Sequence, residues 1–197
     1  MSTPDTTPAS SLRAAIIGTG RIGDTYDDEL VHYPDLDLPE DVVHASMYSV
    51  WPKSLAASFR TVEGYDLVAG ANRGRERLEE FGDRHDVSGL YTDYREMLDA
   101  EDPDVVAVCT QSPEKCDAVL ACADAGVDAV IVEKAFATSL AEADEMIAAC
   151  EDAGTRIAVD HPMRFSPMYR RLKELAGDGT IGDLTHVTPH SAGLVHG

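Results

Sequence analysis

The sequence predicts an α/β fold built on a doubly wound parallel sheet. Short apolar runs alternate along the chain with longer stretches whose apolar residues recur at helical spacing. The first apolar run leads directly into a glycine-rich turn, and polar clusters follow several later runs. Hydrophobic residues make up 44% of the 197 residues, which is ordinary for a packed globular domain.

The strands are expected where an apolar run is short and is ended by glycine or by polar residues. These runs are Leu12–Ile17, Tyr65–Ala71, Gly89–Tyr91, Asp104–Cys109, Asp128–Val132 and Arg156–Val159. A further run, Leu184–Val187, is expected to begin another strand near the end of the sequence.

The segments between the runs carry helix signals. Leu78 and Phe81 lie three residues apart among charged residues, which is the spacing of one helix face. Ser139 and Glu142 form a capping box at the start of another helix. Helices are therefore expected from about Arg21, over Arg75–His85, from Asp93 through Leu98, from Pro113 to Gly126, from Ser139 to about Gly154, and from Ser166–Pro167 to a point before Gly177 and Gly179. Their alternation with strands predicts right-handed crossovers.

The charge is strongly acidic, with 36 Asp and Glu against 16 Lys and Arg and a net charge of −20. The acids are spread over the predicted helices, which favours a halophilic protein of a salt-rich cytoplasm over a localised acidic tail, although an ordinary acidic protein remains the alternative. Nucleic acid is not an expected partner, because phosphate binding needs a basic face.

Neither a membrane span nor a secretory signal is expected, which again favours a cytoplasmic protein. No apolar run approaches the roughly 20 residues that a span needs, and residues 1–11 lack the layout of a signal peptide. The four cysteines show no zinc-ligand spacing, so they are interpreted as small core residues in a reducing compartment, and no metal is predicted.

The glycine-rich turn has the pattern GxGxxG, formed by Gly18, Thr19, Gly20, Arg21, Ile22 and Gly23. Its place between a buried strand and an expected helix predicts a Rossmann-type dinucleotide-binding site. The first glycine permits the tight turn, the second lets the backbone approach the pyrophosphate, and the third allows close packing. A glycine-rich turn without a ligand is the alternative.

The residues after the second strand are expected to select the cofactor. Asn72 stands where a carboxylate would bind an unphosphorylated ribose, and Arg73 and Arg75 follow it. Because arginine pairs well with phosphate, the sequence favours NADP over NAD. The alternative is that the arginines only neutralise the start of the next helix while Asn72 bonds the ribose.

Polar residues also follow the later strands, at the sheet edge where ligands of doubly wound folds bind. Thr110, Gln111 and Ser112 are expected either to line the cofactor groove or to cap the next helix. Glu133 and Lys134 form either a structural ion pair or a site in which Lys134 handles a substrate hydroxyl proton. His161 is either a general acid or base or a structural histidine.

The domain organisation follows from these motifs. A disordered tail is expected at residues 1–11 and a dinucleotide-binding domain at 12–162, followed at 163–197 by a linking helix and the first strand of an incomplete second α/β domain. Because 49 positions separate Gly23 from Asn72 where about 20 are usual, an inserted loop is expected at 33–58. It would either fold over the cofactor cleft or decorate the surface.

Together these residues resemble the Gfo/Idh/MocA oxidoreductases, named for glucose–fructose oxidoreductase and inositol dehydrogenase. The shared features are the GTGRIG turn, the Glu133–Lys134 pair, the helix start Ser139–Asp144, Arg164–Pro167 and the turn Gly179–Leu184. Ala135 replaces the proline that the family has after the lysine, and Cys116 stands at the position taken to match a family histidine.

The resemblance implies an NAD(P)-dependent oxidoreductase that transfers hydride between nicotinamide and a sugar, polyol or related hydroxyl compound. It also implies that Lys134 contacts the substrate and joins a proton relay. The family's second domain, which completes the substrate pocket, is expected to be truncated in this sequence. The isolated chain is therefore either the cofactor half of an enzyme or a non-catalytic dinucleotide-binding module. Homo-oligomerisation, or a separate chain that completes the second domain, is an open expectation.

Overall fold

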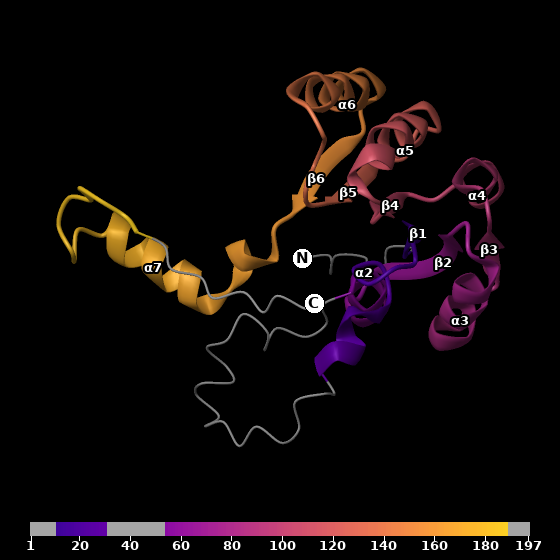
Figure 1. Cartoon of the computed structure of the whole chain (residues 1–197), viewed down its shortest axis with the longest axis horizontal. Coiled ribbons are helices and arrows are strands. Elements are labelled where there is room, and N and C mark those ends of the chain that lie inside the picture. Colours follow the sequence, from indigo (N-terminus) through magenta and orange to yellow (C-terminus); the bar gives the residue numbers. More distant parts are fainter. Residues whose placement is uncertain (1–10, 31–53, 189–197) are drawn as a thin grey trace, which may run out of the picture.

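The computed structural model describes residues 11–30 and 54–188. Its centre is a six-stranded, fully parallel sheet in the order β3-β2-β1-β4-β5-β6 (Figure 1). This order confirms the predicted doubly wound sheet, because the chain starts in the middle, winds to one edge, and then returns to build the other half. The strands are β1 (Leu12–Ile17), β2 (Tyr65–Ala71), β3 (Gly89–Tyr91), β4 (Val105–Val108), β5 (Ala129–Glu133) and β6 (Arg156–Asp160).

Helices cover the two faces of the sheet unequally. The helices are α2 (Leu55–Thr61), α3 (Arg75–His85), α4 (Tyr94–Glu101), α5 (Ser112–Asp124), α6 (Leu140–Ala153) and α7 (Pro167–Gly177), with 3₁₀ helices η1 (Thr25–Leu30) and η2 (Pro162–Phe165). Side chains of α4, α5 and α6 pack on one face of the sheet, and those of α2 and α3 pack on the other. None of the described helices is long and apolar enough to span a membrane.

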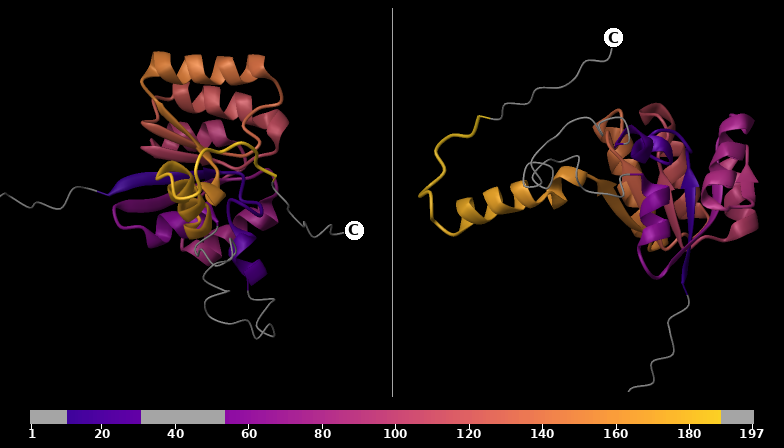
Figure 2. Two further views of the ribbon diagram at one scale, coloured as in Figure 1. Left: turned by 90° about the vertical axis from the view of Figure 1, so that its left-hand side faces the viewer. Right: turned by 90° about the horizontal axis from the view of Figure 1, so that it is seen from below.

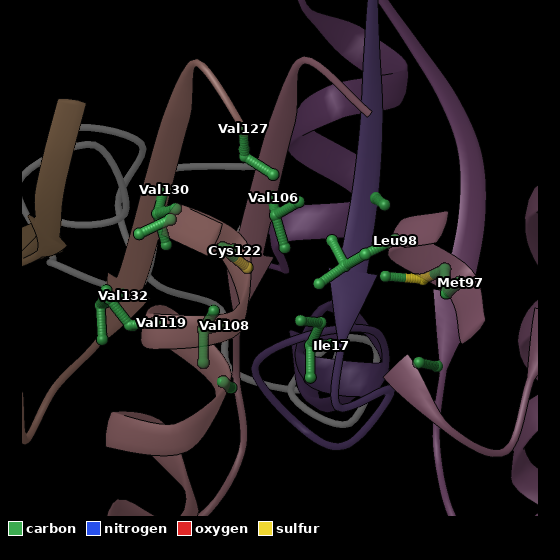
Figure 3. Packing of buried hydrophobic residues seen from close by; sticks show 14 of the residues in the cluster. Ile17, Met97, Leu98, Val106, Val108, Val119, Cys122, Val127, Val130 and Val132 are labelled. Carbon is green, nitrogen blue, oxygen red and sulfur yellow. The ribbon is translucent and has the colours of Figure 1, made fainter. Parts of the chain in front are cut away.

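The larger core lies under α4, α5 and α6 and is aliphatic. Alternate residues of β1, β4 and β5 point into it, because successive strand side chains face opposite sides of a sheet. This core joins residues of the strands to residues of the helices and of the loop before β5. The strand residues are Ile17, Val106, Val108, Val130 and Val132, and the others are Met97, Leu98, Val119, Cys122 and Val127 (Figure 3). Strands buried on both faces explain why the sequence shows continuous apolar runs rather than alternation.

The helix expected from about Arg21 is not formed as a continuous element. The chain makes a turn after the glycines, with the Asp24 amide donating to the Gly20 carbonyl at 2.8 Å, and then enters η1. The helical path resumes at α2, where the Leu55 amide donates to the Ile22 carbonyl at 3.0 Å. The Ala56 amide donates to the Gly23 carbonyl at 3.1 Å. The insertion therefore interrupts the first crossover helix after its first turn.

The two ends of the insertion are also tied to each other and to α3. The Asp27 carboxylate accepts from the backbone amide of Ser54 at 2.9 Å, and Ser54 caps α2. Asp24 is buried and lies 2.7 Å from Nε2 of His85, the last residue of α3. These bonds hold the turn after the glycines against the sheet without a regular helix there. Most of the expected 33–58 loop, and residues 1–10 of the expected tail, lie outside the described residues, while 55–58 belong to α2.

The last described segment departs from the sheet domain. Helix α7 projects away from the sheet in Figure 1 and in the right-hand view of Figure 2. The strand expected at Leu184–Val187 is not formed, and Leu184 and Val187 are exposed. A strand is stable only when a neighbour supplies its ladder of hydrogen bonds, and no described strand lies beside these residues.

Candidate active site

The glycine turn lies at the carboxyl end of β1 and is shaped by backbone contacts. Gly18 adopts a φ of +95°, and a Cβ there would lie 2.9 Å from the carbonyl carbon of Cys109. A Cβ at Gly23 would lie 2.2 Å from the Gly18 carbonyl oxygen. At Gly20, by contrast, the nearest atom to an added Cβ is a guanidinium nitrogen of Arg77 at 3.8 Å. Two glycines are thus required by the turn, whereas the middle one leaves open space for a ligand.

An open groove of about 430 Å³ begins at this turn. The predicted binding residues that line it are Gly18, Gly20, Asn72, Arg73, Thr110 and Gln111. Residues of α3, β3–α4 and α5 complete it, among them Arg77, Arg95, Glu114 and Asp117. The groove therefore runs along the carboxyl edge of the sheet beside β1, β2 and β4, which is where doubly wound folds bind their ligands.

The other predicted residues of the glycine turn serve the turn itself. Thr19 is fully buried, and its Oγ1 accepts from Nδ2 of Asn72 at 2.9 Å. The Arg21 guanidinium stacks over the Tyr26 ring, 4.1 Å from its centroid. The Ile22 carbonyl accepts from Leu55, as described above. These contacts fix the backbone that frames the groove.

Asn72 and Arg73 line the groove, and the side chains of both have partners within the protein. The Asn72 carboxamide is occupied at both ends, because its Oδ1 also accepts from the Gly74 amide at 2.9 Å. The Arg73 guanidinium lies 2.5 Å from the Glu114 carboxylate on α5. Arg75 lines a separate hollow with residues of α3 and β3, so Arg77 is the further α3 arginine that borders the groove.

The loop after β4 contains an unsatisfied polar atom. Thr110 Oγ1 is buried and has no hydrogen-bond partner among the residues that the structure describes. Gln111 is the N-cap residue of α5 and Ser112 is the first helical residue, so the amino end of α5 faces this edge of the sheet. Buried polar atoms are nearly always satisfied. An orphaned hydroxyl in the groove wall, together with the open space at Gly20, fits a polar nucleotide ligand.

A charged cluster lies at the carboxyl ends of β5 and β6. Glu133 and Asp160 are register partners on these neighbouring strands. The Glu133 carboxylate is buried and bonds two lysines, with Oε1 3.1 Å from Lys134 Nζ and Oε2 3.0 Å from Lys115 Nζ. The Lys134–Ala135 peptide bond is cis. Lys134 itself is exposed, so its ammonium group is accessible beside the sheet edge.

Lys115 is a site residue that the sequence did not predict. It is 1% exposed, and its ammonium also donates to the carbonyl oxygens of Glu133 at 2.6 Å and Ala135 at 2.8 Å. All three ammonium protons thus have acceptors on the Glu133–Ala135 segment. Cys116, which was taken to match the family histidine, lies instead with its sulfur 4.0 Å from the Glu145 carboxylate on α6. Lys115, and not Cys116, is therefore the α5 residue whose side chain contacts the Glu133–Ala135 segment.

Asp160, at the end of β6, and His161, which follows it, adjoin this cluster. Burial and the Glu133 carboxylate raise the pKa of Asp160, while His161 and Lys134 oppose the rise. The His161 side chain is exposed. The structure thus gathers the charges of Lys134, His161 and Asp160 at one sheet edge, and the carboxyl of Asp160 is an additional titrating group there.

Comparisons with known proteins identify the family and agree with the fold. A sequence model of the Gfo/Idh/MocA family, described as an oxidoreductase family with an NAD-binding Rossmann fold, matches residues 12–161. D-apiose dehydrogenase of Paraburkholderia graminis is 37% identical over 64% of this chain and 33% of its own length. Myo-inositol 2-dehydrogenase of Thermotoga maritima is 27% identical over 87% of this chain and 42% of its own length.

A solved structure agrees in fold. Scyllo-inositol dehydrogenase from Lactobacillus casei, with bound NAD(H) and scyllo-inositol, superposes with a TM-score of 0.69 at 19% identity, over 89% of this chain and 44% of that protein. The chain thus spans between a third and a half of the length of these relatives. The matched segment contains both the glycine turn and the Glu133–Lys134 pair. The chain therefore belongs to the Gfo/Idh/MocA family of oxidoreductases with an NAD-binding Rossmann fold.

Proposed function

We propose that this chain is the cofactor-binding part of an NAD(P)-dependent oxidoreductase that acts on a hydroxyl group of a sugar, polyol or related compound. The observation that carries the proposal is one continuous sheet edge with an open nucleotide groove at Gly20 and an exposed lysine, Lys134, at the end of β5. The relatives named as apiose and inositol dehydrogenases support the substrate class.

The residues divide into a binding and a reacting group. Gly18 and Gly20 would face the pyrophosphate, Thr110 and Gln111 would line the middle of the groove, and Arg73 would face the adenosine ribose. A bound nicotinamide supplies the hydride acceptor or donor. Lys134 would bind the substrate oxygen and hold or release its proton, since its ammonium is accessible and is oriented by Glu133. His161 is the second candidate for proton transfer at this edge.

The preferred cofactor is proposed to be NADP, with NAD as the alternative. The proposal is supported by two arginines in the groove, Arg73 and Arg77, and by the lack of a carboxylate at the end of β2. The Asn72 carboxamide already forms hydrogen bonds with Thr19 and Gly74. The arginines therefore remain as the donors for a 2′-phosphate.

A cytoplasmic location and a partner for α7 complete the proposal. The four cysteines are all unpaired, which suits a reducing compartment. Phe165 and Leu172 expose most of their apolar surface on the segment that projects from the sheet domain. Such side chains suit burial against a second copy or against a chain that completes the second domain.

The test is a fluorescence titration of the purified chain with NADPH and NADH. The wild type is expected to bind, and Gly20→Ala is expected to weaken binding by about tenfold or more, about 1.4 kcal/mol, because the new methyl group enters the space for the pyrophosphate. The matched control is Gly177→Ala, where an added Cβ meets nothing within 4 Å. Failure of the folded wild type to bind either nucleotide would refute the proposal. Binding without turnover of any sugar or polyol would favour the non-catalytic module.

A further inference from the structure

The groove contains an ion pair that joins two of its walls. Arg73 lies two residues after the end of β2, and Glu114 lies in the first turn of α5. Their side chains meet at 2.5 Å, and both line the nucleotide groove. The Arg73 side chain is 80% exposed and that of Glu114 is 39% exposed, so neither is held in place by burial. The pair can therefore be opened by a competing ligand.

We propose that Glu114 limits the preference for NADP over NAD by competing with the 2′-phosphate for Arg73. This inference rests on the proposed nucleotide site and adds a specificity residue outside the turn after β2. The end of β2 is where a ribose 2′ group is recognised. A phosphate that approaches there needs the Arg73 guanidinium, which Glu114 already occupies. An unphosphorylated ribose makes no such demand.

The charges give the direction of the effect. A phosphate monoester carries between one and two negative charges near neutral pH, so it is repelled by the Glu114 carboxylate while that carboxylate also screens Arg73. A ribose hydroxyl is neutral and is little affected. Glu114 therefore weakens NADP binding selectively, and the arginine is only fully available to a phosphate when the carboxylate is absent.

A second acid on the same helix provides a matched comparison. Asp117 also lines the groove, one turn further along α5, but in the described part of the chain it forms no ion pair with Arg73. Its removal changes the net charge of the protein and of the groove by the same amount as removal of Glu114. A difference between the two variants therefore reports the pair with Arg73 and not the general field of the acidic protein.

The experiment measures NADPH and NADH dissociation constants at low ionic strength for the wild type, Glu114→Gln and Asp117→Asn. Glu114→Gln is expected to shift the ratio of the two constants toward NADPH by roughly three- to tenfold, the scale of one partly exposed charge interaction. Asp117→Asn is expected to leave the ratio within about twofold of the wild type. Thermal melts establish that each variant is folded.

A third variant tests whether the effect runs through the arginine. In the double variant Arg73→Ala with Glu114→Gln, the gain for NADPH is expected to disappear. The inference is overturned if Glu114→Gln moves both nucleotides equally, if Asp117→Asn gives the same shift, or if the gain persists without Arg73. Binding of neither nucleotide by the folded wild type overturns the proposed function and this inference together, whereas binding with an unchanged ratio overturns this inference alone.

Discussion

The ammonium group of Lys115 lies 3.0 Å from Oε2 of Glu133, on the opposite side of the carboxylate from Lys134, which lies 3.1 Å from Oε1. One carboxylate thus binds two lysines in different surroundings. The Lys115 side chain is 1% exposed and that of Lys134 is 63% exposed. The buried lysine holds the segment in shape, and the exposed one remains available to a substrate.

Replacing Lys115 with methionine is expected to destabilise the fold strongly. The change leaves Oε2 of the buried Glu133 carboxylate and two backbone carbonyls without the Lys115 donor, which should lower the free energy of unfolding by about 3–5 kcal/mol in urea denaturation. Lys134→Met is the control, because loss of an exposed partner should cost at most about 1 kcal/mol. Equal losses in the two variants would contradict a structural role specific to Lys115.

Gly23→Ala is expected to disturb the turn, whereas Gly20→Ala is not. An added Cβ at Gly23 would lie 2.2 Å from the Gly18 carbonyl oxygen, and backbone must shift to make room. We expect a loss of about 3 kcal/mol for Gly23→Ala, measured by thermal or urea unfolding. At Gly20 the nearest atom is 3.8 Å away, so the stability should stay close to the wild type even though nucleotide binding falls. A stable Gly23→Ala variant would refute the close packing of this turn.

Asp160→Asn is expected to stabilise the protein at neutral pH but not in acid. Burial and Glu133 raise the pKa of Asp160, so the folded state holds this proton more tightly than the unfolded state does. Ionisation therefore costs folded-state stability as the pH rises through the raised pKa, and asparagine avoids that cost.

The difference in melting temperature between Asp160→Asn and the wild type, followed from about pH 8 to about pH 4, should accordingly shrink as the pH falls. Asp152→Asn on α6 is the control for removing one exposed negative charge. A difference that stays constant over this range, or that matches the control, would contradict the raised pKa of Asp160.

Salt is expected to stabilise the chain. The net charge of −20 repels itself across the surface, and the screening length shortens from about 10 Å at 0.1 M salt to about 3 Å at 1 M. The melting temperature should therefore rise with KCl over this range, as monitored by circular dichroism. A melting temperature that does not change with KCl would argue for an ordinary acidic protein rather than a halophilic one.

Much of the fold could be predicted because local and global signals agree. The bounds of β1, β2, α3 and β3 match the expected ranges, since glycine and polar residues end these apolar runs clearly. The interruption of the helix expected from Arg21 could not be predicted from the sequence, because its continuation at α2 depends on hydrogen bonds between the two ends of an insertion. The strand predicted at Leu184–Val187 is not formed for a related reason, since strand propensity alone does not supply a neighbouring strand.

The site was predictable at its backbone turns and less so at its side-chain contacts. Gly18 and Gly20 border the groove as the GxGxxG pattern indicates. Lys115 and Glu114 are adjacent in sequence on a helix that looked merely amphipathic, and their partners, Glu133 and Arg73, come from two different strand ends. Only the sheet order brings these partners together. A lysine among the apolar residues of α5 was the one available signal, because buried lysines need a partner.

The hydrogen bonds from Leu55 and Ala56 to the carbonyls of Ile22 and Gly23 join the two ends of an interrupted helix. The entropy of closing a loop grows only slowly with its length. The segment between these ends can therefore lengthen, shorten or be exchanged with little effect on the glycine turn. This junction is a suitable insertion site, because a segment of different length or sequence can be placed beside the glycine turn without a change in the geometry of the turn.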